Sequence, residues 1–254
     1  MGSLPEHSAI EFRRYMNRFL YLFGHLSDMT GVMRTPINQH QAFIEPLVAW
    51  LRPRGVNFLT SAFVQDIDFA PAPGRMTVDR LDYTRGGSVT SVAVAPEDLV
   101  LVTTGSQAAD LSAGSMTEAP RPRPSGRCEP MDQCTGAEIL EETLRHLRFD
   151  RHLATIMASS ICVPCNLPYV NNIWLPRTRS DRPPPVPEGA TNLGLIGQYV
   201  ELPREIAFTI ECSVRSAWEA IYVLLKRGPA PPPVYQGQYD PKALFDVLKV
   251  FLCR

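Results

Sequence analysis

The amino-acid sequence predicts an α/β fold in which a β-meander and packed helices surround two short core strands. The first observation is that the two most apolar short runs, residues 98–103 and 192–200, each contain or precede a glycine, as buried strands before tight turns do. The second is a series of short β-type runs separated by Pro-Gly and Gly-Gly turns. The third is helical spacing of apolar residues near both ends of the chain. A chain of 254 residues can bury a sizeable core.

Two helices are expected at the N-terminal end. The first covers residues 8–29, where Ser8 can cap the helix and Glu11, three residues later, can complete a capping box. The second covers residues 41–51 and is expected to end before the turn at residues 53–55. The spacing of a buried stripe in the first helix is given by Phe12, Met16, Phe19, Leu20 and Phe23.

Three short runs with the composition of β-strands follow, at residues 57–69, 76–84 and 88–95. The turns between them predict antiparallel pairing as a meander, which leads into the apolar strand at residues 98–103. We predict that this strand lies beside residues 192–200 as its parallel neighbour in one sheet, because these are the chain's most apolar short runs.

The second half of the chain is expected to be mainly helical. Helical spacing covers residues 136–149, a long helix that ends near Leu225, and a last helix at residues 241–252. Three proline-rich stretches, at residues 119–130, 176–187 and 229–233, are unsuited to helices and are expected to be connectors. In the long helix, the charges at i, i+4 spacing are expected on a solvated face: Glu211, Arg215 and Glu219. Its buried face is expected to hold Ile210, Val214, Ala217, Trp218, Ile221, Leu224 and Leu225.

Composition and charge exclude several classes of protein. A net charge of -1 provides no field to attract nucleic acid, so a nucleic-acid partner is not expected. The six cysteines are scattered and no secretory segment is visible, which predicts a reduced, cytoplasmic setting. No apolar run approaches the ~18 residues of a membrane span.

The generic motifs of catalysis and phosphate binding are absent from the sequence. No two glycines have G-x-G spacing, and there is no P-loop and no G-x-S-x-G elbow. Cys162 and Cys165 form a single C-x-x-C without a second ligand pair, so no metal site is expected. The apolar residues Ile161, Val163 and Leu167 around them predict a packed strand or turn, in which the two cysteines are structural, reduced and free of metal.

Two strand-then-glycine units are the most informative local pattern. Residues 100–106 read VLVTTGS, and residues 193–198 read LGLIGQ and lead into the long helix. A glycine at the end of a buried strand allows a ligand to approach the backbone closely, although many such glycines only form a turn. The pattern by itself leaves cofactor contact and a simple turn both open.

Longer strings resemble the oleate hydratase family, the flavin-containing fatty-acid hydratases also called myosin-cross-reactive antigens. The matching strings occur in family order and cover nearly the whole chain. They are EFRRYMNRFL at residues 11–20, RTPINQHQAFIEPLVAWL at 34–51, DLVLVTTGSQAADLSAGSMTEAP at 98–120, CTGAEIL at 134–140, CVPCNLPYV at 162–170 and GATNLGLIGQYVELP at 189–203.

The resemblance implies part of a fold with two dinucleotide-binding domains, FAD as cofactor, and a homodimeric cytoplasmic enzyme that touches membranes peripherally. The reaction it implies is hydration of a cis double bond of an unsaturated fatty acid such as oleate. In such enzymes FAD acts structurally and electrostatically without net redox change. A tyrosine serves as general acid and a glutamate activates water.

The resemblance also assigns residues to the cofactor. Val64 matches the strand valine that packs against the adenine. Gly105 and Ser106 match the middle flavin motif, and the last flavin motif corresponds to Asn192, Gly197 and Gln198. Val64 has no further support from its surroundings in the sequence, whereas the glycines also fit the strand-end pattern.

Three departures from the family pattern affect the expected activity. The family's N-terminal glycine-rich ADP-binding turn and its glutamate base are missing. The string R-T-x-Tyr-N-Q-Tyr, to which the catalytic tyrosine belongs, has Ile37 and His40 at its two tyrosine positions. A segment carrying much of the fatty-acid pocket is missing where residues 119–130 form a proline-rich joint, which divides the chain into residues 1–118 and 131–254.

Three interpretations remain open from the sequence. The chain is part of a fatty-acid hydratase, a non-catalytic remnant or interaction protein derived from that family, or an unrelated flavin oxidase. The missing glycine-rich turn disfavours the oxidase. Because both the acid and the base are absent, no catalytic residue is assigned, and the isolated chain is expected neither to retain FAD nor to hydrate oleate.

Overall fold

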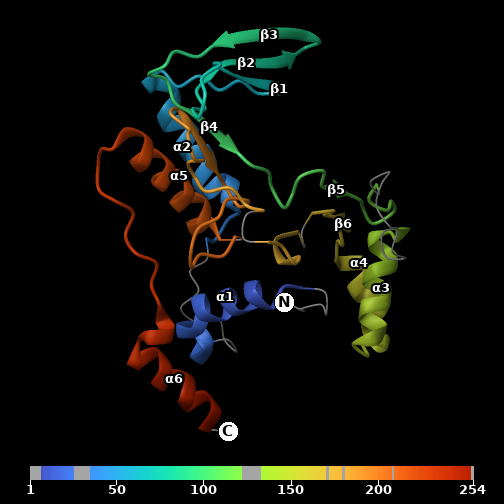
Figure 1. Ribbon diagram of the computed structural model, residues 1–254. Coiled ribbons are helices and arrows are strands. Elements are labelled where there is room, and N and C mark those ends of the chain that lie inside the picture. Colours follow the sequence, from blue (N-terminus) through green and yellow to red (C-terminus); the bar gives the residue numbers. More distant parts are fainter. Residues whose placement is uncertain are drawn as a thin grey trace.

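The computed structural model describes residues 7–25, 35–121, 133–169, 172–178, 181–207 and 209–252. Its largest sheet is antiparallel and contains β1 (Ala62–Phe69), β2 (Val78–Arg85) and β3 (Ser88–Ala93) in that order. The strands β2 and β3 are joined at Gly86 and Gly87, which both adopt positive φ, as the hairpin turns that match strand twist require. The predicted meander is confirmed, and it forms the upper part of Figure 1.

The strands β4 (Val100–Thr103) and β7 (Leu193–Ile196) are parallel neighbours, with Val100 opposite Leu193 and Thr103 opposite Ile196. The prediction that these two apolar segments lie side by side is confirmed, although each strand has only four residues. A proline-rich segment covers the other edge of β7, where the carbonyl of Pro185 accepts from the N–H of Leu195 at 2.7 Å. Proline can accept but not donate, so this segment ends the sheet.

The two sheets share one small core. Val78 of β2, Val100 of β4 and Leu193 of β7 are all buried and form a cluster. The α/β class is therefore confirmed. The arrangement of two dinucleotide-binding domains stays a prediction, because the parallel sheet within the described residues contains only two strands.

The first helix is shorter than predicted. Helix α1 covers Ala9–Phe19 and continues as a 3₁₀ turn, Leu20–His25, while the rest of the expected range lies outside the described residues. Ser8 caps the helix, as predicted, by accepting from the N–H of Glu11 at 3.4 Å. The capping box is wrong, because the Glu11 carboxylate pairs with Arg177 at 2.7 Å and the N–H of Ser8 donates to the carbonyl of Trp174.

The long helix α5 (Ile210–Leu225) was predicted with the wrong face buried. Its buried residues are Cys212, Arg215, Ser216 and Ala220, while Val214 and Trp218 are exposed. The physical reason is that Arg215 finds a buried carboxylate, Glu205, at 3.5 Å, a partner that helical spacing cannot reveal. Small side chains then let the helix approach β7 closely.

The remaining helices are short. The second predicted helix consists of three consecutive elements. A π turn (His40–Ile44) leads into α2 (Glu45–Leu51), and a 3₁₀ turn (Arg52–Arg54), which contains Pro53, follows α2. Pro46 lies in the first turn of α2, where its missing N–H costs nothing. The last helix α6 (Pro241–Leu252) has the predicted bounds. Single 3₁₀ turns occur at Asp150–His152, Asn172–Trp174 and Gly237–Tyr239.

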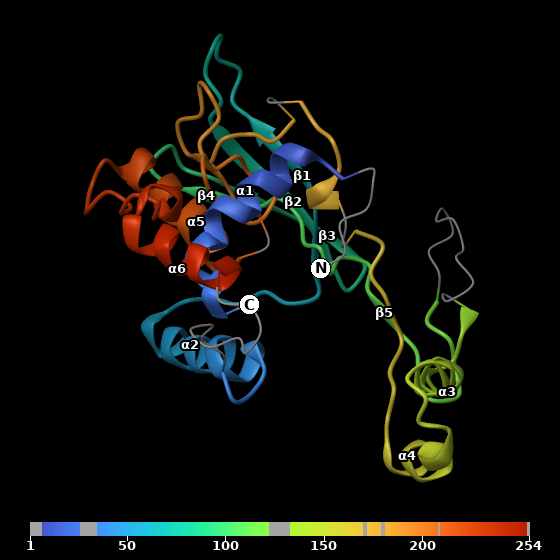
Figure 2. The same cartoon turned by 90° about the horizontal axis from the view of Figure 1, so that it is seen from below.

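Helices α3 (Gly136–His146) and α4 (Leu153–Ser159) pack against each other on an arm that both views show apart from the other helices (Figures 1 and 2). The arm is joined to the body by a two-residue strand pair, β5 (Ser112–Ala113) with β6 (Cys165–Asn166). Helix α3 was predicted, and Thr135 with Glu138 forms its capping box. The sequence did not predict α4 or β5, whereas β6 lies in the segment that was predicted as a packed strand or turn. No helix in the described ranges has the length and apolarity to cross a bilayer.

Candidate functional site

The candidate site is a cavity of about 300 Å³ at the point where β4 and β7 end. It is formed by the two strand-then-glycine units and the first turn of α5. Because parallel strands bring their carboxyl ends to the same edge, ligands in α/β sheets commonly bind at this position. The lining residues are Thr103, Gly105, Ser106, Ile196, Gly197, Gln198 and Ser213.

Both glycines at the cavity are required by geometry. Gly105 has φ +115°, and a Cβ there would lie 3.3 Å from the ring of Tyr199. Gly197 has φ +102°, and a Cβ would lie 3.1 Å from a methyl group of Thr103. An L side chain is strained in this backbone region, and the tight contacts add to that strain. The backbone is therefore bare on this side of the cavity.

Hydrogen bonds join the two strand ends to each other. The N–H of Thr104 donates to the carbonyl of Ile196 at 3.0 Å, extending the parallel ladder by one residue. The amide oxygen of Gln198 accepts from the N–H of Gln107 at 3.3 Å. These contacts hold the loops after β4 and β7 in one arrangement.

The first turn of α5 forms the third wall and supplies a residue that sequence analysis missed. Thr209 caps α5 by accepting from the N–H of Cys212 at 3.1 Å, and Ser213 in the same turn lines the cavity. Ser216 accepts from the N–H of Gly197 at 2.9 Å and thereby ties the helix to the strand end. A helix N-terminus carries partial positive charge and favours electron-rich ligand atoms. Two serines three residues apart after a strand-end glycine are the signal that could have indicated this wall.

The structure brings four of the six predicted cofactor residues to this cavity: Gly105, Ser106, Gly197 and Gln198. Asn192 lies at the opposite end of β7, is completely buried and binds both backbone groups of Val78, at 2.8 and 2.9 Å. Val64 lies on β1, pairs with Tyr83 and is exposed. Neither Asn192 nor Val64 lines the cavity.

The two positions that correspond to the family tyrosines are also away from the cavity. Ile37 is exposed, and His40 is exposed in the π turn, where its Nδ1 lies 3.1 Å from the carboxylate of Glu45. Neither residue contributes to the cavity lining.

The cysteines form no described cluster with metal-binding geometry. Within the residues that the structure describes, no group of three or more His, Cys, Asp or Glu side chains could hold a metal ion. Cys162 and Cys165 are free thiols. The expected packing around them is wrong in part, because Ile161 and Val163 are exposed. In α5, burial raises the pKa of the Cys212 thiol to about 12.

Comparisons with known proteins and with a family model agree on one family. An oleate hydratase of Streptococcus pyogenes serotype M49 (strain NZ131) is 24% identical over 359 residues, which cover 96% of this chain and 60% of that protein. A linoleate hydratase of Lactiplantibacillus plantarum is 34% identical over 105 residues, 40% of this chain and 18% of that protein. The chain thus spans less than two thirds of the length of either relative. The family model of the MCRA family matches residues 3–129 and 127–222, most of the sequence, and the chain therefore belongs to the MCRA family.

Proposed function

We propose that this chain is the flavin-contacting part of a fatty-acid hydratase and that, as an isolated chain, it does not hydrate unsaturated fatty acids. The observation that carries the proposal is the cavity where the glycine ends of β4 and β7 meet the first turn of α5. The names of the relatives, oleate hydratase and linoleate hydratase, support the substrate class, unsaturated fatty acids with cis double bonds.

The residues at the cavity fit one end of FAD. The bare backbone at Gly105 and Gly197 lets a flat ring approach, and the N-terminus of α5 favours an electron-rich edge. A volume of about 300 Å³ is at the lower limit of small-molecule sites, so the cavity suits the flavin end rather than the whole dinucleotide. In the family that the sequence resembles, FAD supplies positioning and electrostatics without net redox change.

The proposed lack of activity rests on the chemistry of two positions. Ile37 carries no proton to donate. His40 is exposed beside Glu45, and an imidazole differs from a phenol in pKa and reach. Each catalytic acid or base is commonly worth ~10²- to 10⁴-fold in rate, so loss of the acid alone reduces turnover severely.

The missing pocket segment is also part of the proposal. The alignment with the streptococcal relative extends over 359 residues, whereas this chain has 254, so that relative has segments without a counterpart here. The two family matches meet at residues 127–129, inside the proline-rich joint. Both facts support an internal deletion at residues 119–130. If the whole pocket segment is missing, the alternative to a hydratase is a non-catalytic interaction protein derived from the family.

The test is to purify the chain, record its visible absorbance, titrate it with FAD by flavin fluorescence, and assay oleate for hydroxy product by mass spectrometry. We expect a colourless protein, weak and reversible flavin binding, and no hydroxystearate above the background without enzyme. Gly197→Ala is expected to weaken flavin binding, because the added Cβ strains the backbone and presses on Thr103, which also lines the cavity.

Gly55→Ala is the matched control, since Gly55 also has positive φ but no atom lies within 4 Å of its Cβ position. It should lose stability but bind flavin like the parent chain. Absence of any flavin binding, or equal binding by the Gly197 variant, would contradict the cavity assignment. Measurable turnover of oleate would contradict the proposed inactivity and leave the cavity assignment standing.

A further inference from the structure

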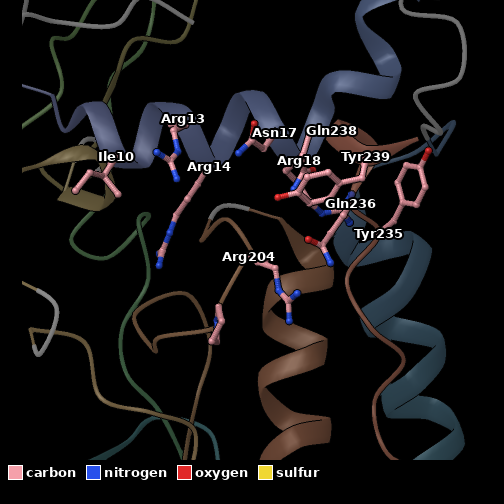
Figure 3. A pocket seen from close by; sticks show the side chains of 11 residues that line it. Ile10, Arg13, Arg14, Asn17, Arg18, Arg204, Tyr235, Gln236, Gln238 and Tyr239 are labelled. Atoms are coloured by element: carbon pink, nitrogen blue, oxygen red, sulfur yellow. The ribbon is translucent and has the colours of Figure 1, made fainter. Parts of the chain in front are cut away.

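A second cavity, of about 460 Å³, lies between α1, the loop after Glu201, and the segment that leads to α6. Figure 3 shows arginine side chains from α1 on one side of it and Arg204 on the other. Four of its lining residues are Arg13, Arg14, Arg18 and Arg204, and no described lining residue is acidic. This cavity is separate from the glycine-lined cavity, with which it shares no lining residue.

Two of the four guanidinium groups are already neutralised. Arg14 pairs with Glu201 at 2.5 Å. Arg18 is buried and pairs with Glu205, at 3.5 Å, and with Glu211. These carboxylates neutralise the two arginines but do not themselves line the cavity. Arg14 and Arg18 are fixed in place by these contacts.

The other two arginines have no such partners. Within the described part of the chain, neither Arg13 nor Arg204 forms an ion pair or a side-chain hydrogen bond. Asn17 and Gln236 add amide donors to the same lining. Two unpaired guanidinium groups together with neutral donors provide several N–H groups for an anion and no negative charge to compete with it.

The backbone at Arg204 supports a ligand role. Arg204 has φ +69°, in the left-handed region that is unfavourable for a residue with a side chain. A sequence selected only for stability would place glycine or asparagine there. Strained residues with a functional side chain are a recurrent feature of ligand sites. At Arg204 the strained backbone carries one of the two unpaired guanidinium groups.

We propose that this arginine-lined cavity binds an oxyanion group, a carboxylate or a phosphate, between Arg13 and Arg204. Ile10 and Pro203 give the same cavity an apolar side, which can accommodate a short carbon chain attached to the anion. The proposal is independent of the flavin assignment, because the two cavities use different residues. The interaction is expected to be salt-sensitive, since both arginines are exposed.

The experiment is isothermal titration calorimetry of the full chain at low ionic strength with two anionic probes, hexanoate and inorganic phosphate, and with neutral hexanol as reference. We expect at least one anion to bind in the millimolar range and hexanol to bind more weakly. The double variant Arg13→Gln/Arg204→Gly should bind that anion about tenfold more weakly. Glycine at position 204 adopts the same φ without strain, so this variant is expected to stay folded, which circular dichroism checks.

Arg148→Gly/Arg151→Gln is the matched charge control, because both arginines are exposed on the separate arm and Arg148, like Arg204, has positive φ. It should bind like the parent chain. Binding of hexanoate alone identifies a carboxylate site, binding of phosphate alone a phosphate site, and binding of both a general oxyanion site. The proposal is overturned if neither anion binds, if the double variant at positions 13 and 204 binds as tightly as the parent chain, or if the control double variant loses as much affinity as it does.

Discussion

Asn192 illustrates how one polar side chain can be used for structure at a position where a cofactor role was expected. Its amide oxygen accepts from the N–H of Val78 and its amide nitrogen donates to the carbonyl of Val78. Both backbone groups are inside the core that the two sheets share, where an unpaired group is costly. Asparagine is suited to this because it presents one donor and one acceptor side by side. In this chain, Asn192 links β2 to the parallel pair.

The first prediction at the residue scale concerns this link. Asn192→Ala leaves the N–H and the carbonyl of Val78 without partners and opens a small void. We expect the free energy of unfolding to fall by about 2–4 kcal/mol, measured by urea denaturation. Asn57→Ala, at an exposed asparagine, should change it by less than about 0.5 kcal/mol. Equal effects of the two substitutions would mean that the Asn192 contacts contribute nothing to stability.

Local residue patterns were predictable where the partner is close in sequence. The Ser8 cap depends on an N–H three residues away, and the structure contains it. The other bond of the predicted capping box, from the N–H of Ser8 to the carboxylate of Glu11, is not formed, because that carboxylate accepts from Arg177, which is 166 residues away in sequence. A strong ionic partner brought in by the fold outcompetes a local hydrogen bond, and no local pattern contains that information.

At the scale of elements, apolar runs predicted the parallel strands and the meander, but not how α5 packs on them. The strand pair β4 and β7 follows from two short buried runs of the right length. Besides the ion pair of Arg215 with Glu205, the packing of α5 depends on Gly194, where an added Cβ would lie 2.7 Å from the side chain of Leu101 and 3.0 Å from the Cβ of Ala220. At this point Ala220 and Leu224 face the strand, while Val214 and Trp218 on the other side of α5 are exposed.

This packing leads to a prediction for the pair of elements. Gly194→Ala should crowd the side chains of Leu101 and Ala220 and lower the free energy of unfolding by about 1–3 kcal/mol. Ala220→Gly alone should cost about 1 kcal/mol through helix propensity. In the double variant, Ala220→Gly removes one of the atoms that crowd the new side chain at position 194. The measured loss of unfolding free energy should therefore be smaller than the sum of the losses in the two single variants. A double-mutant cycle by urea denaturation tests this, and simple additivity would show that the contact does not limit the packing.

At the scale of the whole molecule, the chain exposes far more surface than its mass requires. Its accessible surface is 18096 Å², whereas a compact protein of 28.3 kDa exposes roughly 11,000 Å². Many large apolar side chains in the described residues are exposed, and Trp50, Phe63, Ile161 and Phe251 are examples. The outward apolar face of α5 is part of this surface. We predicted that this face of α5 is buried because its apolar residues have helical spacing. Such spacing indicates an apolar face but does not identify the element that packs on it.

The large exposed surface predicts an unusually weak dependence of unfolding on denaturant. The urea m-value scales with the surface that unfolding exposes, and this chain buries only about three quarters of the area that a compact chain of its mass buries. We therefore expect an m-value roughly a quarter below that of compact proteins of similar length. The measurement is equilibrium urea unfolding at several protein concentrations. A full m-value at every concentration would contradict the open structure. A value that rises with concentration would show instead that copies of the chain cover one another's apolar faces, because only self-association depends on concentration.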